Sequence, residues 1–595
     1  MKQSLAGLIV LLAISMTAKS QVKINFEASF TEPQAHYVEM EMNISGLTKD
    51  YIDVKMPVWA PGSYLVREFA RNIEGFTASA NGKPVRFEKV RKNAWRIYSA
   101  KAANVKINYR VYAFEVSVRT SFIDDSHAFL SSTGIFLYPD GMLKQPSTVK
   151  IKPFKGWKKV STGLEPVAGQ PFTYTAANFD ILFDSPIEVG NQDVFEFTAS
   201  GVKHEVAMFG GGNYDQEKLK VDMAKIVDHA TAIYGENPNK HYTFIVHNFA
   251  TGGGGLEHLN STVLGASRDK YTDTKGYKGF LNLVAHEYYH LWNVKRLRPI
   301  ALGPFDYDNE NYTTSLWVAE GFTSYYENKL MYRSGFFTEQ ETVQNLATAT
   351  NNVVNTPGAK IQTVAEASYD AWIKSYRPNE NSSNSTISYY SKGEVVGMLM
   401  DIEIANATKG AKNLDDVMKA MYDAYYKKLG RGYTDAEFKT MVEKISGISF
   451  TNFWKTYVNS TDPIDYVKYF GYAGIKVVNE NEGKNVPYLG AATKKLEGRV
   501  MVTVVSRNSS SWIAGLNVND EIISVDGNPA EEAVDKMAII KGKNVGESVI
   551  FTVRRDGILK DITIKLLANA SVKLTATLDE NETELQKAVR NGWLK

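Results

Sequence analysis

The chain of 595 residues contains no cysteine. This absence excludes disulfide bonds, cysteine-ligated zinc, a cysteine nucleophile and lipid attachment to an N-terminal cysteine. The chain also lacks a charge surplus, because 68 Lys and Arg stand against 66 Asp and Glu, and this balance does not favour nucleic acid as a partner. A chain of this length exceeds a single hydrophobic core, so we expect about three domains.

Long apolar runs are absent except at the N-terminus. Lys2 precedes the apolar run Leu5–Met16, and Ala18–Ser20 offers small residues at the positions that a cleavage site requires. The run is shorter than the roughly 20 residues that a membrane-spanning helix needs. We therefore interpret residues 1–20 as a secretory signal peptide with maturation near Gln21. The expected location is periplasmic, extracellular or at the cell surface, with no stable membrane anchor.

The pattern of apolar residues divides the remaining chain into three parts and a tail. Residues 21–190 alternate with period two between turn signals, which predicts an N-terminal β-sandwich domain. Residues 191–465 begin with strands around a helix at Gln216–Tyr234 and continue with helical spacing, which predicts a mixed and mostly helical domain. β-Branched runs return in residues 466–570, and residues 571–595 form a charged tail that could end in a helix. The expected fold class is multidomain α+β.

We expect strands at Val22–Phe30, Tyr37–Ile44, Val105–Tyr112, Ser147–Ile151, Lys203–Phe209, Tyr242–Asn248, Arg499–Val505, Glu521–Val525 and Glu547–Arg554.

The segment Phe280–Arg298 carries a His-Glu-x-x-His motif. His286 and His290 are four residues apart, so on a helix they share one face at the separation that two nitrogen ligands of a tetrahedral Zn2+ ion require. Glu287 lies beside the first histidine and can reach a zinc-bound water as a general base. Apolar flanks as far as Val294 predict a buried helix. The alternative is a pair of core histidines hydrogen-bonded to the backbone.

A third metal ligand downstream must be a carboxylate, because all nine histidines lie at or before His290. Glu320 lies in Leu316–Tyr332, an amphipathic helical pattern that can present a carboxylate rigidly, and it is the favoured ligand. Glu327, two turns further on, is the alternative. Three acidic residues of a polar segment are interpreted as a solvated loop: Asp306, Asp308 and Glu310. Two histidines and one glutamate leave a coordination position open for water, which predicts a zinc metallopeptidase.

The motif in its context resembles a known family. The segment from His286 to Arg296 (HEYYHLWNVKR) and the segment Leu316–Phe322 (LWVAEGF) closely resemble the PDZ-containing glycyl aminopeptidases, gluzincins related to the larger zinc aminopeptidase superfamily. Pro57–Tyr64 and Arg67–Asn72 resemble the N-terminal β-domain signature of that family. The resemblance implies a thermolysin- or aminopeptidase-like catalytic domain. It also implies removal of small N-terminal residues, such as Gly or Ala, from peptides with a free N-terminus.

The resemblance assigns two further roles. Gly252–His258 is similar to the Gly-x-Met-Glu-Asn strand of the superfamily, and this likeness implies that Glu257, with Gly254 and Gly255, binds the substrate's free amino group. Leu256 and His258 depart from that motif, and the alternative is a glycine-rich turn. Tyr390-Ser391-Lys392-Gly393 is similar to the superfamily's Tyr-x-Lys-Gly, which implies that the Tyr390 hydroxyl stabilises the oxyanion. Tyr389 is its rival.

The C-terminal region resembles a PDZ domain in two places. Ala514–Gly527 matches the PDZ pattern of a turn, a strand and an Asp-Gly hairpin, with Asn519 in place of the usual glycine. Val553–Gly557 reads as the closing hairpin. Tyr488–Ala491 is the candidate loop for a ligand's C-terminal carboxylate. The alternative role is a structural cap on the catalytic domain.

Between His290 and Glu320 lies an insert of 29 residues, longer than the usual spacing in the superfamily. Its segments Arg296–Pro299 and Phe305–Asp308 resemble the glycyl aminopeptidase branch, and we hypothesise that the insert shapes the substrate pocket. Two other functions are compatible with the sequence: a zinc endopeptidase whose PDZ domain recruits protein tails, and a non-catalytic peptide-binding scaffold.

Overall fold

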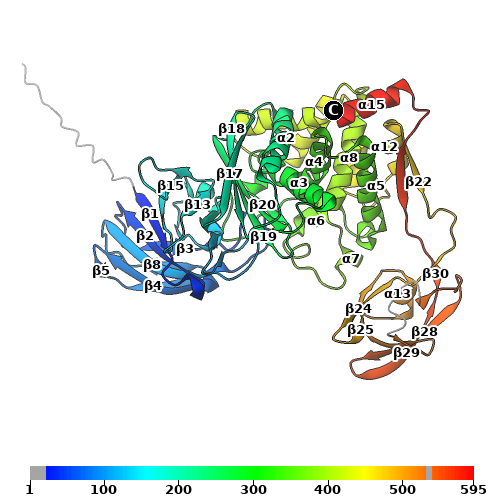
Figure 1. The fold of residues 1–595 in the computed structure, drawn as a ribbon, viewed down its shortest axis with the longest axis horizontal. Helices are drawn as coiled ribbons and strands as arrows, with labels where there is room; N and C mark the ends of the chain where they lie inside the picture. Colours follow the sequence, from blue (N-terminus) through cyan, green and yellow to red (C-terminus); the bar gives the residue numbers. More distant parts are fainter. Residues whose placement is uncertain (1–21, 531–538) are drawn as a thin grey trace, which may run out of the picture.

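The computed structural model describes residues 22–530 and 539–595, so the predicted signal peptide lies outside the described residues. An N-terminal β-rich domain, a largely helical middle region and a C-terminal β domain follow one another along the molecule (Figure 1). The multidomain α+β class expected from the sequence is confirmed. Within the part of the chain that is described, no helix is both long and apolar enough to cross a bilayer.

The N-terminal domain stacks three sheets around one apolar core. Along β8 every second residue is buried, and this period-two burial is what places one face of each strand in the core. The eight-stranded sheet contains, in spatial order, β14 (Glu165–Pro166), β15 (Thr173–Ala176), β12 (Ser147–Lys152), β1 (Lys23–Ser29), β2 (Tyr37–Ser45), β8 (Asn104–Tyr112), β4 (Ile73–Ala80) and β5 (Lys83–Pro84). One four-stranded sheet contains, in spatial order, β13 (Lys159–Thr162), β16 (Ile187–Gly190), β10 (Ala128–Leu130) and β9 (Phe122–Ile123). The other contains β11 (Tyr138–Pro139), β3 (Ile52–Lys55), β7 (Ala94–Ile97) and β6 (Phe87–Arg91).

A five-stranded sheet opens the middle region. Its order is β17 (Asp193–Ala199), β18 (Val202–Phe209), β19 (His241–Phe249), β21 (Ser261–Ser267) and β20 (Gly255–Glu257), with β18, β19 and β21 parallel. Seven consecutive residues of β19 are buried, as expected for a parallel strand covered on both faces. Helix α2 (Gln216–Tyr234) has its predicted bounds, because the Asp215 side chain caps its N-terminus and Gly235 ends it in a left-handed conformation.

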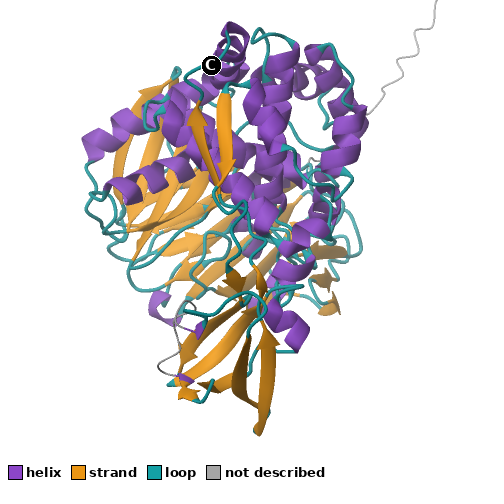
Figure 2. Ribbon diagram, turned by 90° about the vertical axis from the view of Figure 1, so that its right-hand side faces the viewer, coloured by secondary structure: helices purple, strands orange, loops and turns teal. Residues whose placement is uncertain are grey.

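Helices make up most of the middle region, as Figure 2 shows, and they share a core with the five-stranded sheet. They are α3 (Thr274–Tyr289), α4 (Phe322–Arg333), α5 (Glu339–Asn355), α6 (Val364–Tyr369), α7 (Ser382–Ser385), α8 (Tyr389–Ala407), α9 (Leu414–Met421), α10 (Asp435–Ser446), α11 (Thr451–Phe453) and α12 (Tyr466–Tyr472), with π-helical segments η5 (Trp317–Gly321), η7 (Tyr422–Lys428) and η8 (Trp454–Val458).

The insert between His290 and Glu320 docks onto the N-terminal domain. Tyr307 is buried in that domain's core, and Asp308 accepts hydrogen bonds from Lys55 and Asn93. The Trp59 indole nitrogen donates to the carbonyl of Asp306 at 2.7 Å. None of the insert's residues is among those that line the cleft at the His-Glu-x-x-His motif. The hypothesis that the insert shapes the substrate pocket is therefore replaced by a role in joining the two domains.

The β domain near the C-terminus is inserted between two paired strands. β22 (Ile475–Asn479) pairs with β31 (Leu574–Leu578), and β31 packs on α5. The inserted strands are β23 (Pro487–Tyr488), β24 (Ala491–Leu496), β25 (Arg499–Val505), β26 (Glu521–Val525), β27 (Asn528–Pro529), β28 (Ser548–Arg555), β29 (Ile558–Lys565) and β30 (Leu567–Ala568). Asn519 has φ of 70°, a left-handed conformation that asparagine tolerates, which explains why it can replace glycine there.

The C-terminal segment is part of the helical region. Helix α15 (Glu584–Leu594) lies beside α8 (Figure 1). Its Trp593 is fully buried, with its indole nitrogen 2.5 Å from the Tyr325 hydroxyl. The sequence-based boundaries at 466 and 570 assigned β22 to the PDZ domain and β31 to a tail. The structure revises both, because β22 and β31 pair with each other and pack on α12 and α5 of the helical region.

We predict that Trp593→Ala lowers the free energy of unfolding of the helical region by about 3–5 kcal/mol, because it empties a buried site in the core. Far-UV circular dichroism during denaturation measures the change. Leu585→Ala is the control, since Leu585 lies on the same helix and is half-exposed, and it should cost less than about 0.5 kcal/mol. Equal free energies of unfolding in the two variants would contradict a stabilising role of Trp593.

Candidate metal centre and cleft

His286, His290 and Glu320 meet at one point. His290 Nε2 lies 3.2 Å from His286 Nε2 and 3.2 Å from Glu320 Oε2, and His286 Nε2 lies 3.8 Å from Glu320 Oε2. Nitrogen and oxygen ligands at zinc's usual bond lengths form a tetrahedron with edges of about 3.3–3.5 Å. Glu320 Oε1 is buried and has no hydrogen-bond partner among the described residues. The donor set and its spacing therefore fit a divalent cation of the zinc type.

Local backbone structure explains how these three side chains converge. Helix α3 carries His286 and ends at Tyr289, so His290 is its C-cap residue; the helix is shorter than the apolar flanks up to Val294 predict. Glu320 lies in η5, and such π-helical turns occur often at functional sites. Any side chain at Gly321 would overlap the backbone of Gly393 in α8. The two glycines therefore let α8 pack directly on the turn that presents Glu320.

Outer partners fix the orientation of both imidazoles. His286 Nδ1 lies 2.7 Å from Glu327 Oε2, and Asn282 donates to the other oxygen of Glu327 at 2.7 Å. His290 Nδ1 lies 2.7 Å from the carbonyl of Asn293. Each contact leaves Nε2 free to face the metal position. Glu327, the alternative third ligand suggested by the sequence, is thus placed behind His286, where it supports that ligand.

Glu287 lies in the same cleft, of about 320 Å³, and is buried with Oε2 unpaired among the described residues. Burial raises the pKa of Glu287 to about 7, although His286 and His290 oppose that shift. A Cβ atom at Gly255 would overlap the Glu287 carboxylate. Glycine at this position of β20 is therefore required for the close approach of strand and helix.

Glu257 also faces the cleft. It ends β20, it is buried, and its Oε1 has no partner among the described residues. Ligand atoms of Glu257, Glu287 and His290 lie within 4.8 Å of one another. Gly254 has φ of 83°, which turns the chain into β20, and both Gly254 and Gly255 line the cleft. The cleft therefore holds a buried carboxylate that needs a positively charged partner.

The tyrosine pair at the start of α8 divides into two environments. Tyr390 lines the cleft, and its ring centroid lies 6.4 Å from that of His286. Tyr389 is fully buried and is not among the lining residues. Burial raises the pKa of Tyr390 well above its usual value, so its hydroxyl stays protonated and can donate a hydrogen bond.

Sequence reasoning missed two residues that the N-terminal domain contributes. Gly62, with φ of 85°, approaches the Glu257 carboxylate so closely that a Cβ atom there would lie 2.6 Å from Glu257 Oε1. Arg119 lines the cleft, and its Nη2 donates to the carbonyl of Gly255 at 3.2 Å. Gly62 lies within the Pro57–Tyr64 segment, which the resemblance marked without assigning a role. No local pattern marked Arg119.

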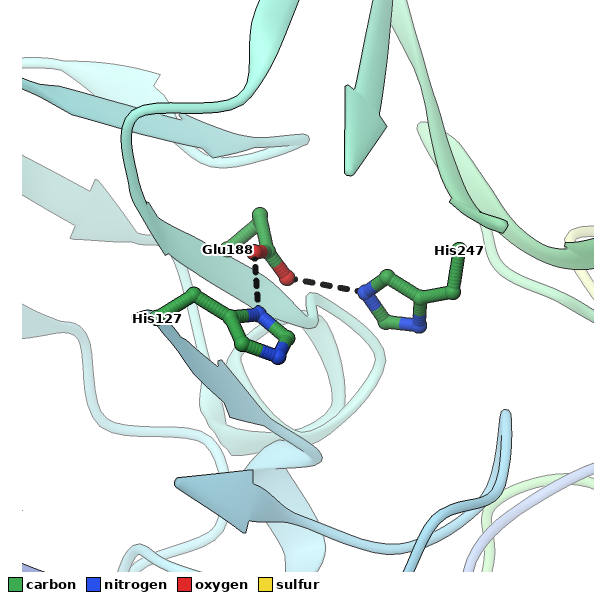
Figure 3. A group of neighbouring side chains, drawn as sticks. All are labelled: His127, Glu188 and His247. Carbon is green, nitrogen blue, oxygen red and sulfur yellow. Dashed lines mark hydrogen bonds and ion pairs between the residues drawn. The ribbon is translucent and has the colours of Figure 1, made fainter. Parts of the chain in front are cut away.

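A second cluster of histidines and a glutamate lies between the domains (Figure 3). Glu188 in β16 is completely buried, and its two oxygens lie 2.7 Å from His127 Nδ1 and 2.9 Å from His247 Nε2. The His127 ring stacks on Phe209, at a centroid distance of 3.5 Å. Each imidazole pairs with its own oxygen at hydrogen-bond length. The cluster is therefore a polar bridge from the N-terminal domain to β19 of the five-stranded sheet.

We predict that Glu188→Gln lowers the free energy of unfolding at neutral pH by about 3–5 kcal/mol, because it breaks a buried pair. Burial alone would raise the pKa of Glu188, but the two imidazoles outweigh burial and lower it. The stabilisation is therefore present above the unfolded pKa of about 4.3 and is lost as pH falls through the lower, folded pKa. Melting curves of both proteins across this range measure the effect, and a pH-independent difference would contradict it.

We predict that Glu327→Gln weakens metal affinity about 10–100-fold, because His286 loses the carboxylate that orients its ring. Competition with a chelator measures the affinity. Glu341→Gln, which changes an exposed carboxylate outside the cleft, is the control and should retain the affinity of the unmodified protein. An unchanged affinity in Glu327→Gln would show that the contact with His286 Nδ1 plays no part in binding.

A two-histidine, one-glutamate cage beside a buried glutamate, carried by helices on a five-stranded sheet, is the arrangement of a metallopeptidase site. Three family descriptions match the chain: "Peptidase M61 N-terminal domain" at residues 25–191, "M61 glycyl aminopeptidase" at 279–396 and "PDZ domain" at 487–566. The protein is therefore a metallo-aminopeptidase that carries the two domains described for M61 peptidases and a PDZ domain.

Similar proteins include a solved structure that matches nearly the whole chain. An aminopeptidase N family protein from Idiomarina loihiensis is 29% identical, with a TM-score of 0.89 over 96% of this chain and 100% of that chain. An M1 zinc metallopeptidase from Deinococcus radiodurans is 11% identical, with a TM-score of 0.46 over 71% of this chain and 90% of that chain. The Serine protease Do-like HtrA of Lactobacillus helveticus is 35% identical over 74 residues, which span 12% of this chain and 18% of that protein.

Proposed function

We propose that this protein is a zinc aminopeptidase that removes a small N-terminal residue, such as Gly or Ala, from peptides. The observation that carries the proposal is the position of Glu257. A buried carboxylate with an unpaired oxygen lies beside Glu287 and the metal cage, where the ammonium group of a peptide's N-terminus would neutralise it. An endopeptidase needs no such group. The match to the M61 glycyl aminopeptidase description supports a small first residue.

The proposed metal is zinc, held by His286, His290 and Glu320. Two imidazole nitrogens and one carboxylate oxygen at the observed spacing suit zinc in a catalytic site. When bound, zinc supplies Lewis acidity at the scissile carbonyl and makes water acidic enough to attack at neutral pH.

The protein's own residues move the proton and hold the substrate. Glu257 binds the α-ammonium group, which sets the scissile bond one residue away, beside Glu287. Glu287 accepts a proton from the attacking water and gives that proton to the nitrogen of the leaving amine as the C–N bond breaks. Tyr390 donates a hydrogen bond to the oxygen that becomes negative in the transition state. Each of these side chains lines the same cleft.

We further propose that the protein is exported, on the support of the signal-peptide pattern in residues 1–20. For the PDZ domain we propose binding of a peptide C-terminus. A groove of about 730 Å³ is lined by Tyr488, Leu489, Gly490 and Ala491, the segment expected to bind a carboxylate, which supports that role.

We predict that Glu287→Gln lowers kcat on alanine and glycine p-nitroanilides about 10²–10⁴-fold while zinc content stays at one per chain, because the variant loses the proton acceptor and keeps the metal ligands. Initial-rate kinetics measure kcat, and elemental analysis measures the zinc content.

N-acetylated peptides are the matched substrates in this experiment. They lack the ammonium group that Glu257 binds, so cleavage should be lost for the blocked peptides and retained for the free ones. Equal cleavage of free and blocked peptides would instead support the endopeptidase alternative. Full function of Glu287→Gln in the cell, in spite of lost hydrolysis, would support the scaffold.

A further inference from the structure

Arg119 is a cation that the mechanism leaves unused. It lies between β8 and β9 of the N-terminal domain and reaches the cleft of the helical region, where its Nη2 donates to the carbonyl of Gly255. Its Nε is buried and has no hydrogen-bond partner among the described residues. No ion pair involving Arg119 occurs in the described ranges. A guanidinium that is half-satisfied inside a ligand cleft has donors to offer to a ligand.

The backbone around Arg119 is fixed. Its N–H donates to the Ser117 hydroxyl at 3.1 Å, and its carbonyl accepts from the Ser131 hydroxyl at 3.2 Å. Thr120 holds the other side of the loop through a bond to the carbonyl of Glu115. A cation on an anchored loop loses little conformational freedom when it binds a partner.

The strand β20 sets the distance between the two ends of a bound substrate. Glu257 lies at one end of this strand, and Gly255, next to both Glu287 and Arg119, lies at the other. Two residues of a strand span about 6.6 Å. An extended dipeptide, from its ammonium group to its carboxylate, has nearly the same length of about two residues. A dipeptide anchored at Glu257 therefore places its carboxylate near Arg119.

The charges of the residues that line the cleft also favour a dipeptide as its ligand. The carboxylates of Glu257, Glu287, Glu320 and Glu327 line the cleft, while Arg119 is the cation among its lining residues that is not an imidazole. A free carboxylate can take two parallel hydrogen bonds from a guanidinium, whereas a peptide carbonyl or an amide offers a neutral acceptor. The carboxylate end of a substrate would otherwise be repelled by these glutamates.

We propose that Arg119 binds the C-terminal carboxylate of the substrate on the leaving side of the scissile bond, so that free dipeptides are the preferred substrates. This inference rests on the proposed aminopeptidase function and names the substrate class of the same cleft. The N-terminal domain is then part of the substrate site, and Arg119 is a specificity-determining residue.

The test compares Ala-Ala with its C-terminal amide, which differs only in the charge of that group. We expect kcat/KM for the free acid to exceed that for the amide about tenfold or more in the unmodified protein, mainly through KM. Arg119→Gln should bring the ratio to about 1, and Arg119→Lys should restore part of it. Arg71→Gln, an exposed arginine of the same domain that does not line the cleft, is the control and should keep the full ratio.

A binding measurement separates this inference from the proposed function. In the Glu287→Gln background, calorimetry should show Ala-Ala binding about tenfold more tightly than the amide, and the double variant with Arg119→Gln should bind both equally. Failure to hydrolyse both Ala-Ala and its amide would overturn the aminopeptidase function, whatever these affinities are. A ratio near 1 in the unmodified protein, or a ratio that persists in a folded Arg119→Gln, would overturn the role of Arg119.

Discussion

The structure depends on the burial of charge at one point, where α3, η5 and β20 meet. Glu257, Glu287 and Glu320 are each at most a few per cent exposed, and each has an oxygen without a hydrogen-bond partner among the described residues. Burying several carboxylates together is unfavourable unless cations neutralise their charge. The two histidines alone do not balance it. A metal ion and a substrate ammonium group are the partners whose geometry and charge this arrangement accommodates.

Close packing of backbone makes that concentration possible. Gly255 allows the strand to approach Glu287, Gly62 allows the N-terminal domain to approach Glu257, and Gly321 meets Gly393 where α8 crosses η5. At each of these positions a Cβ atom would collide with a cleft carboxylate or with a neighbouring backbone. Because these glycines have no side chain, elements of two domains lie close enough for the charged side chains of the cleft to act together.

The N-terminal domain is joined to the helical region by contacts of several kinds. The insert that follows His290 places Tyr307 in the N-terminal core and Asp308 on Lys55, and the bridge through Glu188 connects β16 to β19. At the opposite end, β22 pairs with β31, and α15 packs on α8. The PDZ domain is thus held at both of its ends by the helical region, while the cleft is closed by the N-terminal domain.

The sequence alone determined the features that follow from local spacing. The four-residue interval of the two histidines requires a shared helix face, the absence of later histidines requires a carboxylate as third ligand, and period-two burial predicts strands such as β8, which the structure contains. The sequence favoured Glu320 over Glu327 but left both open, because both lie on the same helical pattern. The tertiary structure decides between them, since Glu320 lies in the π-turn at Trp317–Gly321 and faces the two histidines, while Glu327 lies behind His286. Arg119 and Gly62 were beyond local reasoning for the same physical reason: they reach the cleft across a domain interface, and contacts between residues far apart in the chain leave no periodic signal in it.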